Sequence, residues 1–71
     1  MIIDSEAFKE LRVKNNLTQK ELAKKMGCVQ SNVANIECGT QGLSMEVFVS
    51  LCKIYKEKPE QILKKLKITI H

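Results

Sequence analysis

A chain of 71 residues is long enough for one domain whose hydrophobic core only just outweighs the entropy lost on folding, so we expect a single domain over residues 1–71 with its core in 5–66. Its 44% of hydrophobic residues exclude a disordered chain, and no apolar run is long enough for a signal peptide or a membrane span, which leads us to expect a cytoplasmic protein. The formal net charge of +4 favours a polyanionic partner.

The first helical segment is expected from about Ser5 to Lys14. Ser5 can cap its N-terminus, because a hydroxyl at that position accepts a hydrogen bond from an unpaired backbone N–H group. Phe8, Leu11 and Arg12 follow helical spacing and share one side. We therefore predict that this side, including the guanidinium, faces the interior.

The second segment opens with the strongest start signal in the chain. In the run from Thr18 to Glu21, the Thr hydroxyl and the Glu carboxylate can accept hydrogen bonds from each other's free backbone N–H groups, which is a capping box. Leu22, Ala23 and Met26 form the expected buried stripe. Gly27 ends the helix, because glycine enters the left-handed conformation without a steric penalty.

The third segment is expected from about Val29 to Cys38, and Gly39 closes it. Val33 and Ile36 form its inner side, which Val29 can extend. The uncharged polar residues of this segment point elsewhere, and they are Gln30, Ser31, Asn32 and Asn35.

Two further helices complete the expected all-helical domain. Ser44 can cap a fourth helix that continues to Tyr55, and apolar residues on nearly all of its sides indicate the central helix. Pro59 suits the first turn of a fifth helix, because proline lacks the N–H group that this position leaves unpaired. The apolar stripe continues there with Ile62, Leu63 and Leu66.

The two ends of the chain share a preference for extended structure. Met1 to Ile3 is apolar, and Lys67 to His71 alternates between polar and apolar residues. These patterns leave two alternatives open. Either both ends are unstructured, or they pair as a short terminal β-ribbon within or between subunits.

The second and third segments resemble those of a known family. The run Leu17 to Gly27 reads LTQKELAKKMG, the run Val33 to Gly39 reads VANIECG, and PEQIL follows from Pro59. With these spacings the chain resembles the Cro and phage-repressor-like helix-turn-helix family, also named the Xre family, from Phe8 to Leu66. The resemblance implies an all-α, five-helix, lambda-repressor-like fold, in which the third helix reads bases and the second abuts the DNA backbone.

The resemblance assigns base reading to the polar residues of the third segment. Gln30, Ser31 and Asn35 match the base-facing positions of the family, and Asn32 lies between them. An amide carries a donor and an acceptor together, which suits the N6 and N7 edge of adenine. We therefore expect A·T contacts within each half-site.

Phosphate contacts are implied for a second group of residues. Gln19 matches the family position at the N-terminus of the second helix, where N–H groups and the helix dipole favour an anion. The loop at Thr40 and Gln41 lacks the Lys or Arg common there, so we expect its backbone N–H groups to meet a phosphate instead. Further electrostatic contacts are expected from Lys14, Asn16, Lys20 and Lys24.

Two positions bear on the structure rather than on base reading. Arg12 and Glu37 match a family pair that forms a largely buried salt bridge between the first and third helices, which explains a guanidinium on an inward side. Val29 stands where the family usually has Ser or Thr. We therefore expect the third helix to start without a side-chain cap.

The resemblance also implies a homodimer, because one recognition helix contacts few base pairs. We place its interface at Leu63 and Leu66, extended by Ile68 and Ile70. The function expected is a sequence-specific transcription regulator, a repressor that binds a palindromic operator in double-stranded DNA. The alternative is a protein-interaction module of the same fold, an antitoxin or an adaptor, which a large apolar patch on the last two helices would favour.

The residues do not indicate other chemistry. With no nucleophile–base pair, no paired catalytic carboxylates and no phosphate-binding glycine loop, we expect neither enzyme activity nor a cofactor. Cys28, Cys38 and Cys52 form no CxxC pair, and only His71 could add a nitrogen ligand, so neither a metal site nor a disulfide framework is expected. We interpret them as reduced thiols. The alternative is redox sensing by Cys38, which lies near the exposed end of the third helix.

Overall fold

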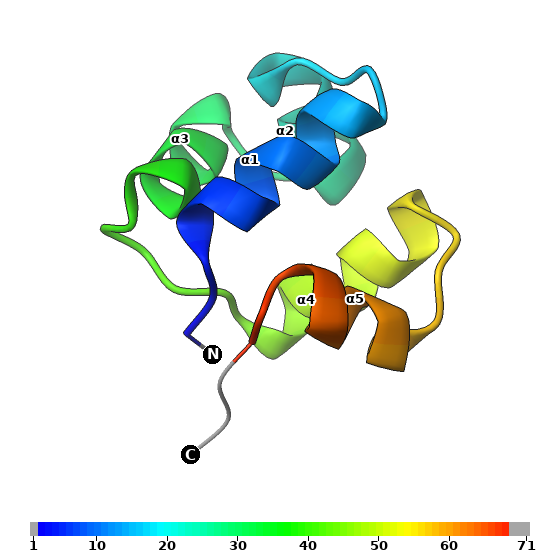
Figure 1. The fold of residues 1–71 in the computed structure, drawn as a ribbon. Coiled ribbons are helices and arrows are strands. Elements are labelled where there is room, and N and C mark those ends of the chain that lie inside the picture. The colour runs from blue at the N-terminus through cyan, green and yellow to red at the C-terminus, as the bar shows by residue number, and fades with distance from the viewer. Residues whose placement is uncertain (1, 69–71) are drawn as a thin grey trace.

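The computed structural model describes residues 2–68, and these contain the helices α1 (Ser5–Lys14), α2 (Gln19–Met26), α3 (Gln30–Cys38), α4 (Met45–Ile54) and α5 (Pro59–Lys65). Figure 1 shows α1, α2 and α3 grouped in one half of the molecule and α4 and α5 in the other. The helix α2 packs on α3 and α4, and α1 packs on α3 and α5. This is the all-α, five-helix arrangement that the sequence predicted.

The local signals at the ends of α2 and α3 are confirmed. The Glu21 N–H donates to Thr18 Oγ1 at 3.0 Å and the Thr18 N–H donates to Glu21 Oε1 at 2.9 Å, which completes the capping box. Gly27 and Gly39 end α2 and α3 at φ values of 72° and 80°. Any residue with a Cβ would be strained there, so these glycines allow the chain to leave each helix within one residue.

The starts of α4 and α5 also follow the sequence. The Val47 N–H donates to Ser44 Oγ at 3.2 Å, so Ser44 is the expected cap of α4. Pro59 is the first residue of α5, where its missing N–H group leaves no helical hydrogen bond unmade. Both starts depend on one residue and its immediate neighbours, which is why the sequence alone predicts them.

The start of α1 differs from the expectation. Asp4, not Ser5, is the N-cap, because Asp4 Oδ1 accepts hydrogen bonds from the N–H groups of Glu6 and Ala7, both at 3.0 Å. A carboxylate is a stronger acceptor than a hydroxyl, and its charge suits the positive end of a helix. The backbone hydrogen bond from Ala7 is the main reason that the pKa of Asp4 lies below its usual value.

The helix α3 begins without a side-chain cap, as Val29 led us to expect. Val29 is the N-cap residue with an extended backbone, and its side chain is 64% exposed. The prediction that Val29 extends the inner side of the helix is therefore wrong. An N-cap residue lies outside the helical repeat, so its side chain does not follow the direction of Val33 and Ile36.

The core draws side chains from all five helices. Its buried apolar members are Phe8, Leu11, Leu22, Ala23, Val33, Ile36, Leu43, Phe48, Leu51, Ile62 and Leu66. Arg12 is buried beside them, which confirms the inward side predicted for α1. Met26 and Leu63 are half-buried against this core. The apolar stripes predicted for α2, α3 and α5 thus meet in one cluster.

The helix α4 is not the central helix that its composition suggested. Phe48 and Leu51 are buried, but Met45 is 64% exposed and Val49 is 44% exposed. The main contacts of α4 are with α2 and α5, which cover one side of the helix and leave the other side to solvent. An apolar residue on α4 is therefore not by itself a core residue.

The first described residues lie beside the end of α5. The Asp4 N–H donates to the Leu66 carbonyl at 3.0 Å, and Ile3 and Ile68 are half-buried against the core. Of the two segments predicted to pair, 1–3 and 67–71, the structure describes residues 2, 3, 67 and 68, and Ile2 forms a β-bridge. Met1 and residues 69–71 lie outside the described residues, so the full β-ribbon stays a prediction. Within residues 2–68, no helix combines the length and the apolar character that crossing a membrane requires.

Candidate nucleic-acid interface

A tight turn and a shared apolar contact hold α2 and α3 together. The left-handed Gly27 ends α2, and the Cys28 N–H donates to the Ala23 carbonyl at 3.0 Å. Leu22 and Ala23 from α2 and Val33 from α3 are at most 2% exposed, and the two helices pack on each other. This is the geometry of a helix-turn-helix pair, in which the first helix fixes the orientation of the second.

The helix α3 presents its polar residues outward. The exposed side chains are Gln30, Ser31 and Asn35, and Asn32 beside them is half-buried. Val33 and Ile36 are at most 1% exposed on the opposite side, where they join the core. The structure therefore brings together, on one accessible surface, the four residues that the sequence predicted to read bases.

The predicted ion pair between α1 and α3 is present. Arg12 Nε donates to Glu37 Oε2 at 2.6 Å and Arg12 Nη2 donates to Glu37 Oε1 at 3.2 Å, while Nη1 donates to the Leu17 carbonyl at 2.7 Å. The two charged side chains are 10% and 5% exposed. Burial raises the pKa of Glu37, but hydrogen bonds from Arg12 and Gln19 outweigh burial and leave that pKa below its usual value. An ionised carboxylate thus anchors α3 to α1.

A chain of side-chain hydrogen bonds links this ion pair to the outer side of α3. Gln19 Nε2 donates to Glu37 Oε1 at 3.0 Å, and Gln30 Nε2 donates to Gln19 Oε1 at 3.5 Å. These bonds were not among the sequence-based predictions. The one signal for them in the sequence is that Gln19 and Gln30 each occupy the first position of consecutive helices, and only the packing of α2 on α3 brings those positions together.

The residues predicted to contact phosphate lie on the surface around α2 and α3. Gln19 is half-buried, and the exposed ones are Lys14, Asn16, Lys20, Lys24, Thr40 and Gln41. Asn16 has a left-handed backbone, with φ of 58°, in the turn between α1 and α2. Gln19, Lys20 and Lys24 belong to α2, and Thr40 and Gln41 follow α3, whereas Lys14 lines a hollow between α1 and the end of α5.

One detail of the phosphate prediction is wrong. The backbone N–H groups of Thr40 and Gln41 donate to the Asn35 carbonyl at 3.0 and 3.3 Å, and Thr40 Oγ1 donates to the same oxygen at 3.2 Å. These bonds complete the C-terminus of α3, whose last carbonyls have no partner within the helix. The two N–H groups are therefore not free to meet a phosphate.

A buried hydroxyl lies within electrostatic reach of the ion pair. Among residues 2–68, Tyr55 Oη is buried and has no hydrogen-bond partner. Burial raises the pKa of Tyr55 to about 12, and the charges of Arg12 and Glu37 act on it in opposite directions. The hydroxyl is therefore neutral at physiological pH and costs desolvation energy without a compensating bond.

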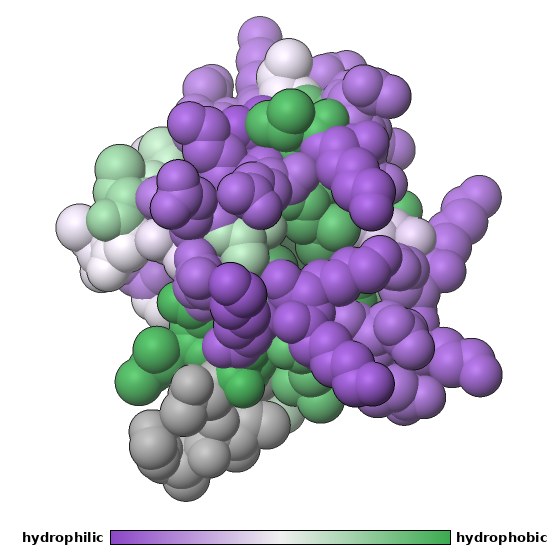
Figure 2. Space-filling model, in the orientation of Figure 1, coloured by the Kyte–Doolittle hydropathy of each residue, from purple (hydrophilic) through white to green (hydrophobic). Residues whose placement is uncertain are grey.

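The predicted dimer interface needs a correction at Leu66. This side chain is fully buried in the core of the single chain, so it is not available to contact a second subunit. Leu63 and Ile68 are half-buried, and Ile70 lies outside the described residues. Figure 2 shows the visible face as mostly hydrophilic, with apolar surface in separate patches, the larger ones in the lower part of the view near the first described residues.

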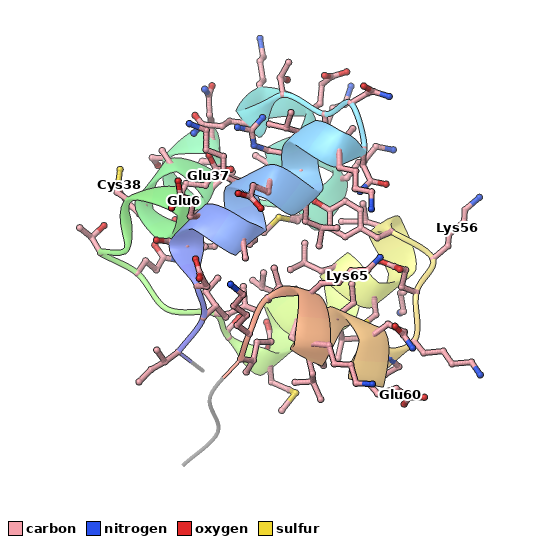
Figure 3. The ribbon with its side chains drawn as sticks, viewed as in Figure 1. Glu6, Glu37, Cys38, Lys56, Glu60 and Lys65 are labelled. Atoms are coloured by element: carbon pink, nitrogen blue, oxygen red, sulfur yellow. The ribbon has the colours of Figure 1, made fainter. Side chains whose placement is uncertain are left out.

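The cysteines form no disulfide. Cys28 and Cys52 are half-buried, and Cys38 is exposed at the end of α3, where Figure 3 shows it directed away from the helices. The described part of the chain holds no group of three His, Cys, Asp or Glu side chains that could bind a metal ion. Cys38 is therefore an accessible thiol close to the polar surface of α3.

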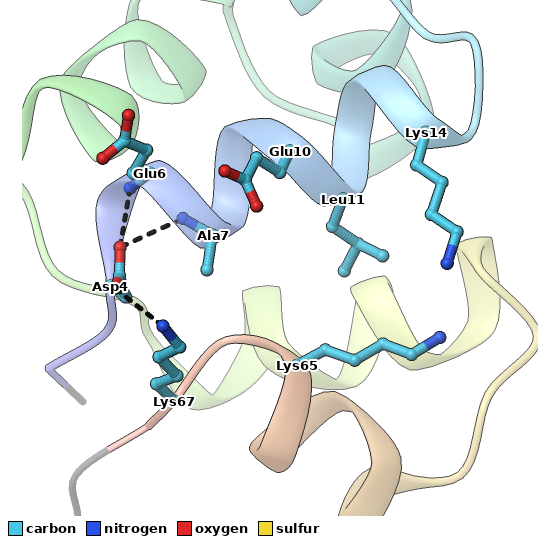
Figure 4. Close-up of a pocket in the computed structure, with 8 residues that line it drawn as sticks. All are labelled: Asp4, Glu6, Ala7, Glu10, Leu11, Lys14, Lys65 and Lys67. Atoms are coloured by element: carbon cyan, nitrogen blue, oxygen red, sulfur yellow. Dashed lines mark hydrogen bonds and ion pairs between the residues drawn. The ribbon is translucent and has the colours of Figure 1, made fainter.

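A hollow of about 290 Å³ opens between α1 and the end of α5 (Figure 4). Glu6, Glu10 and Lys14 line it from α1, and Lys65 lines it from α5. Acidic and basic groups alternate around its mouth, so the hollow favours neither an anion nor a cation. It also lies apart from the polar surface of α3 described above.

Comparison with known proteins agrees with this geometry. The helix-turn-helix family model matches residues 8–63, which is most of the chain. A protein from Archaeoglobus fulgidus, named an uncharacterized HTH-type transcriptional regulator, is 33% identical over 55 residues, which are 78% of this chain and 78% of that protein.

Solved structures share the fold. The clp gene regulator ClgR from Corynebacterium glutamicum superposes with a TM-score of 0.77 at 21% identity, over 89% of this chain and 67% of its own. The restriction-modification controller protein C.AhdI from Aeromonas hydrophila superposes with a TM-score of 0.74 at 24% identity, over 86% of this chain and 92% of its own. At these identities the structural similarity establishes the five-helix fold alone. The family is shown by the match to the family model and by the relative from Archaeoglobus fulgidus. The chain belongs to the Xre/Cro-like helix-turn-helix family, a family of DNA-binding domains rather than enzymes.

Proposed function

We propose that this protein is a transcription regulator, a repressor that binds a palindromic operator in double-stranded DNA as a homodimer. The observation that carries the proposal is the division of α3 into two sides. Val33 and Ile36 anchor one side in the core, and the other side exposes amides. An anchored helix with hydrogen-bonding groups on its free side fits the major groove. The name of the Archaeoglobus fulgidus relative points the same way, and the location we propose is the cytoplasm.

Base reading is assigned to the exposed side of α3. Gln30 lies at the first position of the helix and Asn35 lies more than one turn later, so they would face different base pairs of one half-site. Ser31 and Asn32 lie between these two amides. Because Gln and Asn side chains match the donor and acceptor of adenine, we expect A·T pairs at both positions.

Contacts to DNA phosphates would fix the position of α3 along the major groove. Gln19 and Lys20 begin α2, where backbone N–H groups have no partner within the helix. The Gln41 side chain takes the place of the backbone donors that the loop uses internally. Further contacts would come from Lys14, Asn16 and Lys24, all exposed.

A dimer would double the contacts that one α3 makes with DNA. We place the contact between subunits at Leu63 and Ile68, which are half-buried, with Ile70 as a third member from the sequence. A dimer seated on an operator blocks access of other proteins to it, which is why we propose repression. Sedimentation at micromolar protein concentration tests for the dimer. If the protein is a monomer and also fails to dimerise on DNA, the proposal of a palindromic operator is wrong.

Selection from a pool of random duplexes tests the whole proposal. The wild-type protein should select an inverted repeat with half-sites about one helical turn apart. Gln30→Ala and Asn35→Ala should each lose about 1–3 kcal/mol of discrimination at a different base pair, since each removes an amide. Gln61→Ala on α5 is the matched control, because it removes an exposed glutamine outside the proposed interface. Identical selected sites for all four proteins would contradict the assignment.

A protein-interaction module is the second candidate, and the exposure of Met45 and Val49 on α4 favours it. These residues are spaced i, i+4, so they share one side of the helix. Met45→Ser with Val49→Ser should leave DNA selection unchanged if DNA is the main partner. A wild-type protein that selects no sequence from the pool would favour the interaction module instead.

A further inference from the structure

We propose that Glu37 is a positioning residue for base recognition, and that through Gln19 it determines which end of the Gln30 amide faces the DNA. The inference rests on the proposed function, in which Gln30 reads a base. It gives a role in base specificity to Glu37, which the sequence assigned to an ion pair, and to Gln19, which it assigned to a phosphate contact. The observation behind it is the direction of each hydrogen bond from Glu37 to Gln30.

The first group of the chain is an acceptor that cannot reverse. The Glu37 side chain is 5% exposed, and its carboxylate accepts hydrogen bonds from Arg12 Nε at 2.6 Å and Nη2 at 3.2 Å. An ionised carboxylate has no hydrogen to donate. Any amide that contacts it must therefore present its NH₂ group.

This constraint passes through two amides in turn. The Gln19 group that lies 3.0 Å from Glu37 Oε1 is the NH₂ group, so the Gln19 oxygen is turned toward α3. That oxygen accepts from Gln30 Nε2 at 3.5 Å, at the long end of hydrogen-bond distances. Gln30 therefore keeps its Oε1 and its second N–H for an outside partner, and its side chain is exposed.

The orientation of the Gln30 amide decides which base it can pair with. Adenine presents a donor at N6 and an acceptor at N7, so a bidentate contact needs the amide oxygen at N6 and the N–H at N7. A reversed amide would set donor against donor. Holding the side chain in one orientation before binding saves about twofold to tenfold in affinity, the cost of immobilising one side chain.

The test measures base preference, which a purely structural role would not change. Gln19→Leu removes the one amide that both donates to Glu37 and accepts from Gln30, and it leaves the Arg12–Glu37 pair in place, so we expect the fold to be retained with a loss of stability, measured as a lower urea midpoint. Preference at the base pair that faces Gln30 should fall by about twofold to tenfold, with other positions unchanged. Because Gln19 is also a proposed phosphate contact, Gln19→Leu should in addition weaken binding to all sequences alike. Lys20→Met, at the next position, should show that uniform loss alone and leave the preferences intact.

Glu37→Gln provides a second arm. Its amide can present NH₂ to Gln19, which would reverse both following amides and move the preference from adenine toward a base with an acceptor, such as thymine or guanine. In the free protein, the NMR signals of the Gln30 side-chain NH₂ should shift in Gln19→Leu and in Glu37→Gln, but not in Lys20→Met. These spectra also show whether each variant is folded.

The outcomes separate this inference from the proposed function. A wild-type protein that selects a defined site, together with unchanged preferences and unchanged Gln30 NH₂ signals in Gln19→Leu, would overturn the role of Glu37 and leave the regulator proposal standing. A wild-type protein that selects no site would overturn the regulator proposal itself. Adding Gln19→Leu to Gln30→Ala should not alter base preference further, because the amide to be oriented is gone.

Discussion

Arg12 on α1 and Glu37 on α3 lie 25 positions apart in the chain and meet at 2.6 Å, with both side chains at most 10% exposed. The pair fixes α3, which carries the proposed base-reading residues, against α1. A buried ion pair adds little net stability, because desolvation offsets the attraction between the charges. Its main effect here is on the position of α3, and losing only one partner is costly.

Removing one member of this pair should destabilise the domain strongly. Arg12→Met or Glu37→Leu alone should lower the free energy of unfolding by about 3–5 kcal/mol, because each strands a buried charge. The double variant Arg12→Met with Glu37→Leu should recover most of that loss. Urea unfolding followed by circular dichroism measures all three, with Lys53→Met on the exposed side of α4 as the control. Single variants that cost less than about 1 kcal/mol would show that the pair is solvated in solution.

Stability should fall in acid through Glu37. Its pKa in the folded protein lies below the usual value of 4.5, despite burial, because Arg12 and Gln19 hydrogen-bond to the carboxylate. A carboxyl with a lowered folded pKa contributes stability above its unfolded pKa and loses it as the pH falls through the folded pKa. The free energy of unfolding should therefore drop below pH 4.5. The Arg12→Met, Glu37→Leu double variant should show a shallower drop, and equal slopes in the two proteins would refute this cause.

A cap at the start of α3 should stabilise the domain. Val29 makes no side-chain hydrogen bond to the first turn and is 64% exposed, so Val29→Ser adds a cap and removes little buried surface. The expected gain is about 1 kcal/mol in the free energy of unfolding, measured by chemical denaturation. Val29→Ala, which removes the same side chain without adding an acceptor, should show no such gain. A loss of stability in the serine variant would mean that Val29 packs in solution.

Removing the buried hydroxyl of Tyr55 should cost nothing. Tyr55→Phe keeps the ring and deletes an oxygen that has no partner among the described residues. Because an unpaired buried hydroxyl is desolvated without compensation, the variant should be equally stable or more stable by up to about 1 kcal/mol. Thermal unfolding at pH 7 provides the comparison. A clear decrease in melting temperature would reveal a bound water as the missing partner.

Local signals account for the parts of the fold that the sequence predicted well. The capping box at Thr18 and Glu21 and the left-handed glycines Gly27 and Gly39 each depend on a few neighbouring residues. The same locality explains an error. Asp4 and Ser5 are adjacent candidates for one cap, and a difference of one residue is smaller than periodicity can resolve. The two sides of α3 follow directly from the spacing of Val33 and Ile36.

The order of polar and apolar residues along the chain was enough to predict the helices, the residues at which most of them begin and end, and the outward polar side of α3. These features depend on contacts within one or two helical turns. Tertiary packing alone decided that Leu66 belongs to the core, that one side of α4 faces solvent, and that the Thr40 and Gln41 N–H groups bond to the end of α3. Only packing, likewise, brought Gln19 between Glu37 and Gln30. These outcomes depend on the angles and distances between helices, which spacing along one chain does not encode.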